Sequence, residues 1–143
     1  MRFALRSTIP ALLLLGAACN SGENPIIPPS SPSYRGMTVT LLDSVAAPGG
    51  YVRAQLENRT GGTIQFGALG CWSPVEQLTS RGWVEIGRLS VACTEEISSL
   101  ADGGVYPFGL KAPDEPGHYR WKVGVRDQND SALEVTTEPV AVR

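Results

Sequence analysis

The sequence has 143 residues and a formal net charge of −2, and only 18% of its residues are charged. It contains no run of basic residues, which argues against a nucleic-acid partner. The 11 prolines and 16 glycines are typical of short strands joined by turns, so we expect an all-β protein. The length allows one domain with its own core and excludes two.

The N-terminus has the parts of an export signal. Arg2 and Arg6 are positive, and residues 9–15 are mostly apolar but too few to span a bilayer. Small residues then lead to a cysteine in the segment Gly16-Ala17-Ala18-Cys19. This segment resembles the lipobox of bacterial lipoproteins. We therefore expect a signal peptide over residues 1–18.

Cys19 is accordingly the expected site of lipidation. Acyl chains contribute about 0.8 kcal/mol per buried CH₂, so several chains would anchor the protein to a membrane. Asn20 follows the cysteine, and in enteric bacteria a residue other than aspartate there directs a lipoprotein to the outer membrane. The expected location is therefore the cell envelope, at the outer membrane. A plain signal peptide cut elsewhere and an uncleaved anchor are the alternatives.

Residues 19–34 are expected to form a tether. Residues 20–33 contain four prolines and no aromatic side chain, so they cannot bury enough apolar surface to fold. At the spacing of a polyproline helix they reach about 40 Å, which would hold a domain clear of lipid headgroups.

Beyond the tether the apolar residues alternate with polar ones, as in half-buried strands. Residues 51–57 show this most simply, with Val52, Ala54 and Leu56 on one face. Turn sequences recur about every ten residues, as in a β-sandwich. Further strands are expected around Met37, Val39, Leu41, Ile64 and Phe66 and over residues 75–78, 83–86, 105–110 and 133–142.

Three of these expectations are specific. Residues 75–78 and 83–86 should form a hairpin with Gly82 in its turn. Pro107 confines its strand to the edge of a sheet because proline cannot donate to a ladder. Residues 89–100 could hold one short helical turn at most.

Residues 119–126 alternate most strictly and should form a central strand. The pattern turns Tyr119, Trp121, Val123 and Val125 inward and places Arg120, Lys122 and Arg126 outside.

Cys71 and Cys93 remain once Cys19 is assigned to lipidation. In an oxidising compartment we expect them to form a disulfide, which closes a loop of about 23 residues and stabilises by about 3 kcal/mol. The competing interpretation is a catalytic Cys71 with His118, the single histidine, but it needs a free thiol and a third orienting group.

Two motifs resemble a known family. One is Leu56-Glu57-Asn58, followed by a glycine turn and residues 63–66. The other is Pro116-Gly117-His118-Tyr119, which brings a tyrosine to the central strand. Together they are similar to bacterial immunoglobulin-like domains and to the related small sandwiches of BsuPI-type proteinase inhibitors.

The resemblance implies a single immunoglobulin-like antiparallel β-sandwich of about seven strands over residues 35–143. It also implies that Tyr119 forms a tyrosine corner, in which the phenol bonds to upstream backbone. The two cysteines do not have the wide spacing of antibody domains. Their disulfide should therefore pin a local excursion of the chain instead of joining the sheets.

Several residues suggest ligand sites. Trp72 and Trp83 could contact a sugar ring, whereas Trp121 fits the core pattern. Asp127, Asn129 and Ser131 have the spacing of calcium ligands, but the glycine and the acid of such a loop are missing, which favours a solvated turn. No nucleophile motif, zinc motif or phosphate loop occurs, so we expect no enzyme, no metal and no cofactor.

The sequence therefore predicts a non-catalytic, membrane-anchored envelope lipoprotein, monomeric, whose domain binds another envelope protein or supports an assembly. One alternative is a proteinase inhibitor that presents a loop stapled by the disulfide. The other alternative is a carbohydrate-binding module that uses Trp72 or Trp83.

Overall fold

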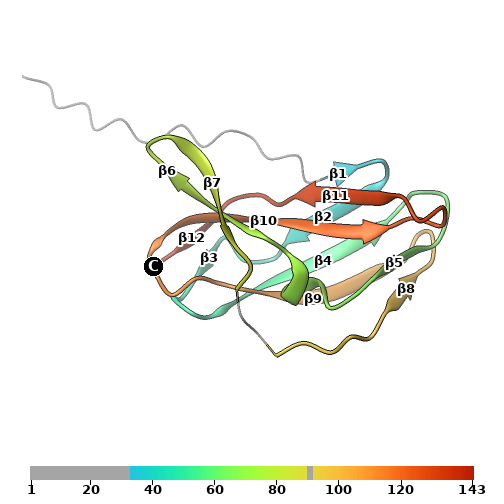
Figure 1. The fold of residues 1–143 in the computed structure, drawn as a ribbon, viewed down its shortest axis with the longest axis horizontal. Coiled ribbons are helices and arrows are strands. Elements are labelled where there is room, and N and C mark those ends of the chain that lie inside the picture. The colour runs from blue at the N-terminus through green and yellow to red at the C-terminus, as the bar shows by residue number, and fades with distance from the viewer. Residues whose placement is uncertain (1–32, 90–91) are drawn as a thin grey trace, which may run out of the picture.

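The computed structural model describes residues 33–89 and 92–143, and these form two β-sheets packed face to face (Figure 1). The described residues include one helix of four residues, α1 (Leu69–Trp72), and are otherwise strands and connections. The expected all-β sandwich is therefore confirmed. The expected signal peptide, the expected lipidation site Cys19 and the expected tether up to residue 32 lie outside the described residues.

The first sheet is antiparallel and contains β1 (Ser33–Tyr34), β2 (Met37–Leu41), β4 (Tyr51–Asn58) and β9 (Val105–Lys111), in that order. β9 is outermost, as Pro107 predicts for its strand. In the middle of the sheet, β4 buries Val52, Ala54 and Leu56 and turns the residues between them outward, which confirms the predicted alternation.

The second sheet is built around β10 (Gly117–Arg126), the longest strand described. One edge of β10 pairs with β11 (Ala132–Thr136) and β12 (Val140–Val142). Its other edge pairs with β6 (Val75–Thr79) near the start and with β5 (Ile64–Phe66) near the end. The outer strands are β7 (Gly82–Gly87) beside β6, β8 (Ser98–Leu100) beside β5 and β3 (Val45–Ala46) parallel to β12.

The first described strands contribute to both sheets. β2 pairs with β4 in the first sheet, and β3 then crosses to pair with β12 in the second. Between the sheets, Tyr119, Trp121, Val123 and Val125 of β10 are at most 5% exposed. This confirms that residues 119–126 form a central strand with the predicted inward face.

Asn58 is a buried polar residue at the end of β4. Its side-chain amide donates to the carbonyls of Gly62 and Leu100, and its oxygen accepts from the backbone and hydroxyl of Thr60. Every polar atom of the side chain therefore has a hydrogen-bond partner, so the full burial of Asn58 leaves no polar group unsatisfied. The asparagine of the strand, turn and strand motif thus fixes the turn and connects it to β8.

The structure departs from the sequence-based expectations in two places, the start of the first sheet and the number of strands. Ser33 and Tyr34 form β1 and pair with Thr38 and Met37. The sequence predicts that these two residues belong to the tether. The two-residue turn between these strands has φ of 47° at Arg35 and 82° at Gly36. A turn of this kind usually has asparagine or aspartate before its glycine. Because arginine stands there, the sequence does not predict this hairpin.

The helical turn allowed in residues 89–100 is not found in the described part of that segment. Residues 92–97 are irregular and residues 98–100 form β8, whereas the helix described lies at Leu69–Trp72. The described residues also form twelve strands, more than the seven expected. Part of the excess comes from the two-residue strands β1 and β3, from β8, which the sequence does not predict, and from the break between β11 and β12 around Pro139.

Candidate functional site

The helix α1 packs directly against β9 of the opposite sheet. A Cβ atom on Gly70 would lie 2.1 Å from the carbonyl oxygen of Gly109, so only glycine permits this approach. Leu69 is buried beneath the helix, and the Ser73 hydroxyl donates to the Leu69 carbonyl at 2.7 Å. These contacts fix α1 and leave Trp72, its last residue, 52% exposed.

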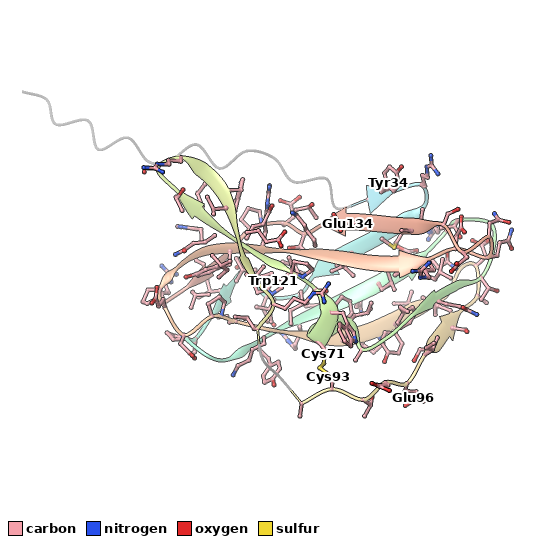
Figure 2. All side chains as sticks on the ribbon, viewed as in Figure 1. Tyr34, Cys71, Cys93, Glu96, Trp121 and Glu134 are labelled. Carbon is pink, nitrogen blue, oxygen red and sulfur yellow. A yellow bond between two sulfur atoms is a disulfide. The ribbon has the colours of Figure 1, made fainter. Side chains whose placement is uncertain are left out.

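A disulfide joins Cys71 of α1 to Cys93 and confirms the predicted pairing. The Cα atoms of the two residues are 6.0 Å apart. Cys93 lies in the connection between β7 and β8, so the disulfide holds this connection against α1, as Figure 2 shows. It pins a local excursion, as predicted, and the bonded Cys71 has no free thiol to act with His118.

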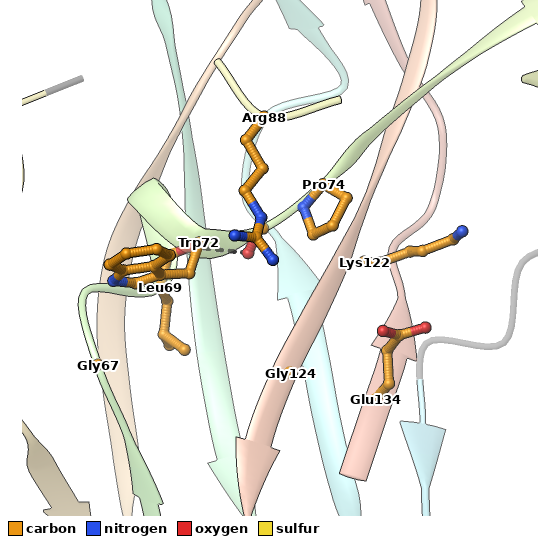
Figure 3. Close-up of a pocket in the computed structure, with 9 residues that line it drawn as sticks. Gly67, Leu69, Trp72, Pro74, Arg88, Lys122, Gly124 and Glu134 are labelled. Carbon is orange, nitrogen blue, oxygen red and sulfur yellow. Dashed lines mark hydrogen bonds between the residues drawn. The ribbon is translucent and has the colours of Figure 1, made fainter. Parts of the chain in front are cut away.

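Two adjoining hollows lie on the outer face of the second sheet, and we call them together the Gly124 groove. They share Gly67 and Gly124, and their volumes are about 250 and 330 Å³. Figure 3 shows the first hollow, with Trp72 and Arg88 on one side of β10 and Glu134 on the other. The second hollow continues toward Ile97, Phe66 and Ala132.

The groove exists because one edge of β10, the edge that pairs with β6 and β5, has no partner strand over part of its length. β6 pairs with it as far as Trp121 and β5 pairs only at Arg126, because the chain leaves the sheet between them to form α1. In this gap Gly124 faces outward without a side chain. A Cβ atom there would have no neighbour nearer than 3.9 Å, so the space above it is open.

Trp72 and Arg88 form one wall of the groove. The guanidinium carbon of Arg88 lies 5.5 Å from the centre of the Trp72 ring, within the range of a cation–π contact. Gly87, with φ of 96°, turns the chain at the end of β7 and brings Arg88 to this position. No ion pair between Arg88 and a carboxylate occurs among the described residues.

Lys122 also lines the groove, but its charge is already compensated. Its ammonium lies 3.0 Å from carboxylate oxygens of Glu76 and Glu85, and Arg120 contacts Glu76 at 2.6 Å. Burial by itself would raise the pKa of Glu76, but the hydrogen bonds from Lys122 and Arg120 outweigh it and hold the pKa below its ordinary value. The hydrogen bonds with Glu76 and Glu85 raise the pKa of Lys122.

The three tryptophans have separate surroundings. Trp121 is 1% exposed in the core, as predicted. Trp83 lies on β7, where the guanidinium carbon of Arg120 is 4.3 Å from its ring centre. The Trp83 indole N–H is buried and has no acceptor among the described residues. Trp83 is not among the residues that line the Gly124 groove, so Trp72 is the tryptophan at this site.

Tyr119 makes the predicted hydrogen bond to upstream backbone. Its hydroxyl donates to the Glu115 carbonyl at 3.0 Å and accepts from the Gln77 side chain at 3.1 Å. A Cβ atom on Gly117 would lie 3.1 Å from the Tyr119 ring, so the glycine of the Pro-Gly motif leaves space for it. Burial, and secondarily the charge of Glu115, raises the pKa of Tyr119.

The connection stapled by the disulfide presents an exposed segment. Residues 92–97 are exposed and belong to no helix or strand. Ile97, at its end, is 71% exposed, although an isoleucine normally gains from burial. The segment therefore displays an apolar side chain at the rim of the Gly124 groove.

The turn at residues 127–131 is held by Asp127. Its side-chain oxygen accepts hydrogen bonds from the backbone of Asn129 and Ser131 at 2.8 and 2.9 Å. This supports the solvated-turn interpretation over a calcium loop. Within the described residues we find no group of three or more metal-binding side chains, and no helix there is long and apolar enough to cross a membrane.

No family model and no curated protein matches the sequence. Among solved structures, Northeast Structural Genomics Consortium target SoR45 superposes with a TM-score of 0.51 at 11% identity, over 77% of this chain and 88% of that chain.

Two other superpositions are looser. The Pseudomonas fluorescens alkylpurine DNA glycosylase AlkC bound to DNA gives a TM-score of 0.39 at 14% identity, over 80% of this chain and 32% of that chain. The PapD-like domain 7 of human CEP192 gives 0.35 at 15%, over 97% and 98%. At such identities the likenesses concern the fold alone, and none assigns a function.

Sequence reasoning singled out Trp72 and the disulfide but missed the other residues of the groove. Arg88 and Ile97 lie in a segment without periodicity. Gly124 stands where the alternation of β10 predicts an outward side chain, so its glycine is the one signal that the sequence offers. The gap between β6 and β5 along β10 depends on how the strands pair, and strand pairing cannot be deduced from this local sequence.

Proposed function

We propose that this chain is a non-catalytic envelope lipoprotein, anchored through Cys19, whose immunoglobulin-like domain binds another envelope protein through the Gly124 groove. The groove supports this proposal most directly. Trp72, Arg88 and Ile97 line it, all three are exposed, and Arg88 has no ion pair among the described residues. Tryptophan and arginine are the residue types that most often dominate the energy of protein interfaces.

The frame around the groove favours binding without large rearrangement. The disulfide, the contact of Gly70 with Gly109 and the ion pairs of Glu76 fix its walls in the free protein. A preorganised surface loses less conformational entropy on binding, which leaves more of the contact energy as affinity.

The test is photo-crosslinking in the native cell envelope. The full chain would carry p-benzoylphenylalanine in place of Ile97, or in place of Thr40, which is exposed on the first sheet. We expect a discrete protein adduct from position 97 and none from position 40. No adduct from either position, or equal adducts from both, would contradict the proposed binding surface.

The anchor is tested separately with Cys19→Ser. We expect the parent protein to incorporate radiolabelled palmitate and to sediment with membranes, and the variant to lose both properties. Palmitate incorporation that survives the substitution would place the lipid elsewhere.

The exposed segment favours a second candidate, a proteinase inhibitor. Residues 92–97 are accessible and the disulfide ties Cys93 to α1, so a protease cleft could receive them without unfolding the domain. The measurement is residual activity of a panel of serine and cysteine proteases with excess protein. Uninhibited proteases throughout would remove this candidate.

A further inference from the structure

We propose that the Gly124 groove binds an extended polypeptide segment with an apolar side chain flanked by a carboxylate and a basic group. The apolar side chain would lie over Gly124, the carboxylate against Arg88 and the basic group against Glu134. This inference rests on the proposed function, because it specifies the ligand of the same surface.

The elongated form of the groove accommodates neighbouring side chains of one extended chain. Here two hollows of about 250 and 330 Å³ adjoin along β10. Two connected hollows of this size suit neighbouring side chains of one extended chain.

The lining favours an apolar side chain at the centre. The open space above Gly124 continues to Ala132 and Ile97, which are exposed, and to the largely buried Phe66 and Val125, and Ile97 is 71% exposed. A side chain placed there would cover apolar surface that water now contacts, at about 25 cal/mol for each Å² removed from water.

The charged side chains of the groove determine which charged groups of the peptide can lie beside its apolar side chain. Arg88 has no ion pair among the described residues, whereas Glu76 and Glu85 already compensate Lys122. Glu134 likewise has no ion pair in the described part of the chain, and it lies across β10 from Arg88 (Figure 3). A carboxylate near Arg88 and a cation near Glu134 would therefore complement both groups.

A peptide fits this lining better than a sugar. A pyranose would stack on the face of an aromatic ring, but the Arg88 guanidinium already lies over Trp72. The other large hydrophobic side chain exposed at the groove, among the described residues, is the aliphatic Ile97, which offers no flat face.

The test measures peptide binding to the full mature chain in detergent micelles by fluorescence anisotropy. The probes are extended heptapeptides with leucine at the centre and aspartate, asparagine or lysine on each side. Matched peptides carry serine at the centre. We expect the leucine peptides with one acidic and one basic neighbour to bind about ten-fold more tightly than the serine peptides or those with two like charges.

Variants assign the binding to the groove. Gly124→Leu should fill the space and weaken binding by about ten-fold or more, because a side chain there meets no neighbour. Arg88→Glu should shift the preference toward peptides in which lysine replaces the aspartate. The control His118→Leu, exposed on β10 outside the groove, should leave binding unchanged.

Three results would overturn the inference. They are equal binding of all peptides, binding that Gly124→Leu leaves intact, and binding of a glycan panel in place of peptides. The adduct from position 97 separates this failure from that of the proposed function. With an adduct but no peptide preference, the binding surface stands and the ligand chemistry is wrong.

Discussion

At the scale of single residues, Glu76 connects three strands. It lies on β6, is 7% exposed, and holds Arg120 and Lys122 of β10, while Lys122 also contacts Glu85 of β7. A carboxylate this buried is tolerated because two cations compensate it. The residue therefore stabilises the sheet beside the Gly124 groove without contacting a ligand there.

Glu76→Gln should lower the free energy of unfolding at pH 7 by about 1–3 kcal/mol. The folded-state pKa of Glu76 lies below its ordinary value of 4.5. Its stabilisation is therefore complete above about pH 4.5 and declines as the pH falls through the lower folded-state value. The difference between parent and variant should shrink over that range in urea denaturation curves.

Glu134→Gln is the matched control, because Glu134 has no ion pair among the described residues. We expect a change within about 0.5 kcal/mol at pH 7. Asp43 should contribute acid sensitivity to parent and variants alike, since hydrogen bonds from Arg53 lower its pKa to about 2. A Glu76→Gln variant that keeps the parent's stability at pH 7 would show that the ion pairs contribute nothing.

At the scale of elements, α1 and the connection between β7 and β8 shape the groove. The helix contains only Leu69-Gly70-Cys71-Trp72 and makes no side-chain cap. A helix this short is not stable by itself, so its packing must determine it. Gly70 against Gly109 and the disulfide to Cys93 supply that packing.

Gly70→Ala should destabilise the protein by about 1–3 kcal/mol, because its Cβ atom would overlap the Gly109 carbonyl. Gly124→Ala is the matched control. It introduces the same methyl group into open space, so stability should stay the same or rise by up to about 1 kcal/mol. Thermal unfolding of the two variants side by side makes the comparison. Equal effects would refute the close contact.

Replacing both cysteines, Cys71→Ser with Cys93→Ser, should lower the free energy of unfolding by about 3 kcal/mol. A reducing agent should destabilise the parent protein equally and leave the double variant unaffected. Urea denaturation with and without reductant measures both effects. If reduction leaves the parent's stability unchanged, the disulfide does not constrain the unfolded chain as described.

At the scale of the whole molecule, the sandwich follows from alternation that is visible in the sequence. Residues 51–57 predict a half-buried strand, residues 119–126 predict a central strand, Pro107 predicts an edge, and the number of cysteines predicts the disulfide. The strand signals are local in the sequence, and the disulfide follows from the expected oxidising compartment. Each can therefore be recognised without knowing the fold.

The groove could not be predicted in this way. Its floor depends on which strands pair with β10 and where they leave it, and its walls come from α1 and from Arg88 after β7. These segments lie far apart in the sequence, and no common pattern of apolar and polar residues connects them. Before the fold is known, the site is indicated only by Trp72, a tryptophan outside the core pattern, and by the glycine at position 124, where the alternation predicts an outward side chain.

The central claim is that the Gly124 groove holds a partner protein. The most direct measurement is the yield of the photo-adduct from position 97 in intact envelopes, with and without Gly124→Leu. We predict a fall in yield of about ten-fold with Gly124→Leu and no change with His118→Leu. An adduct that forms equally in all three proteins would contradict the claim, because the partner would then bind with the groove filled.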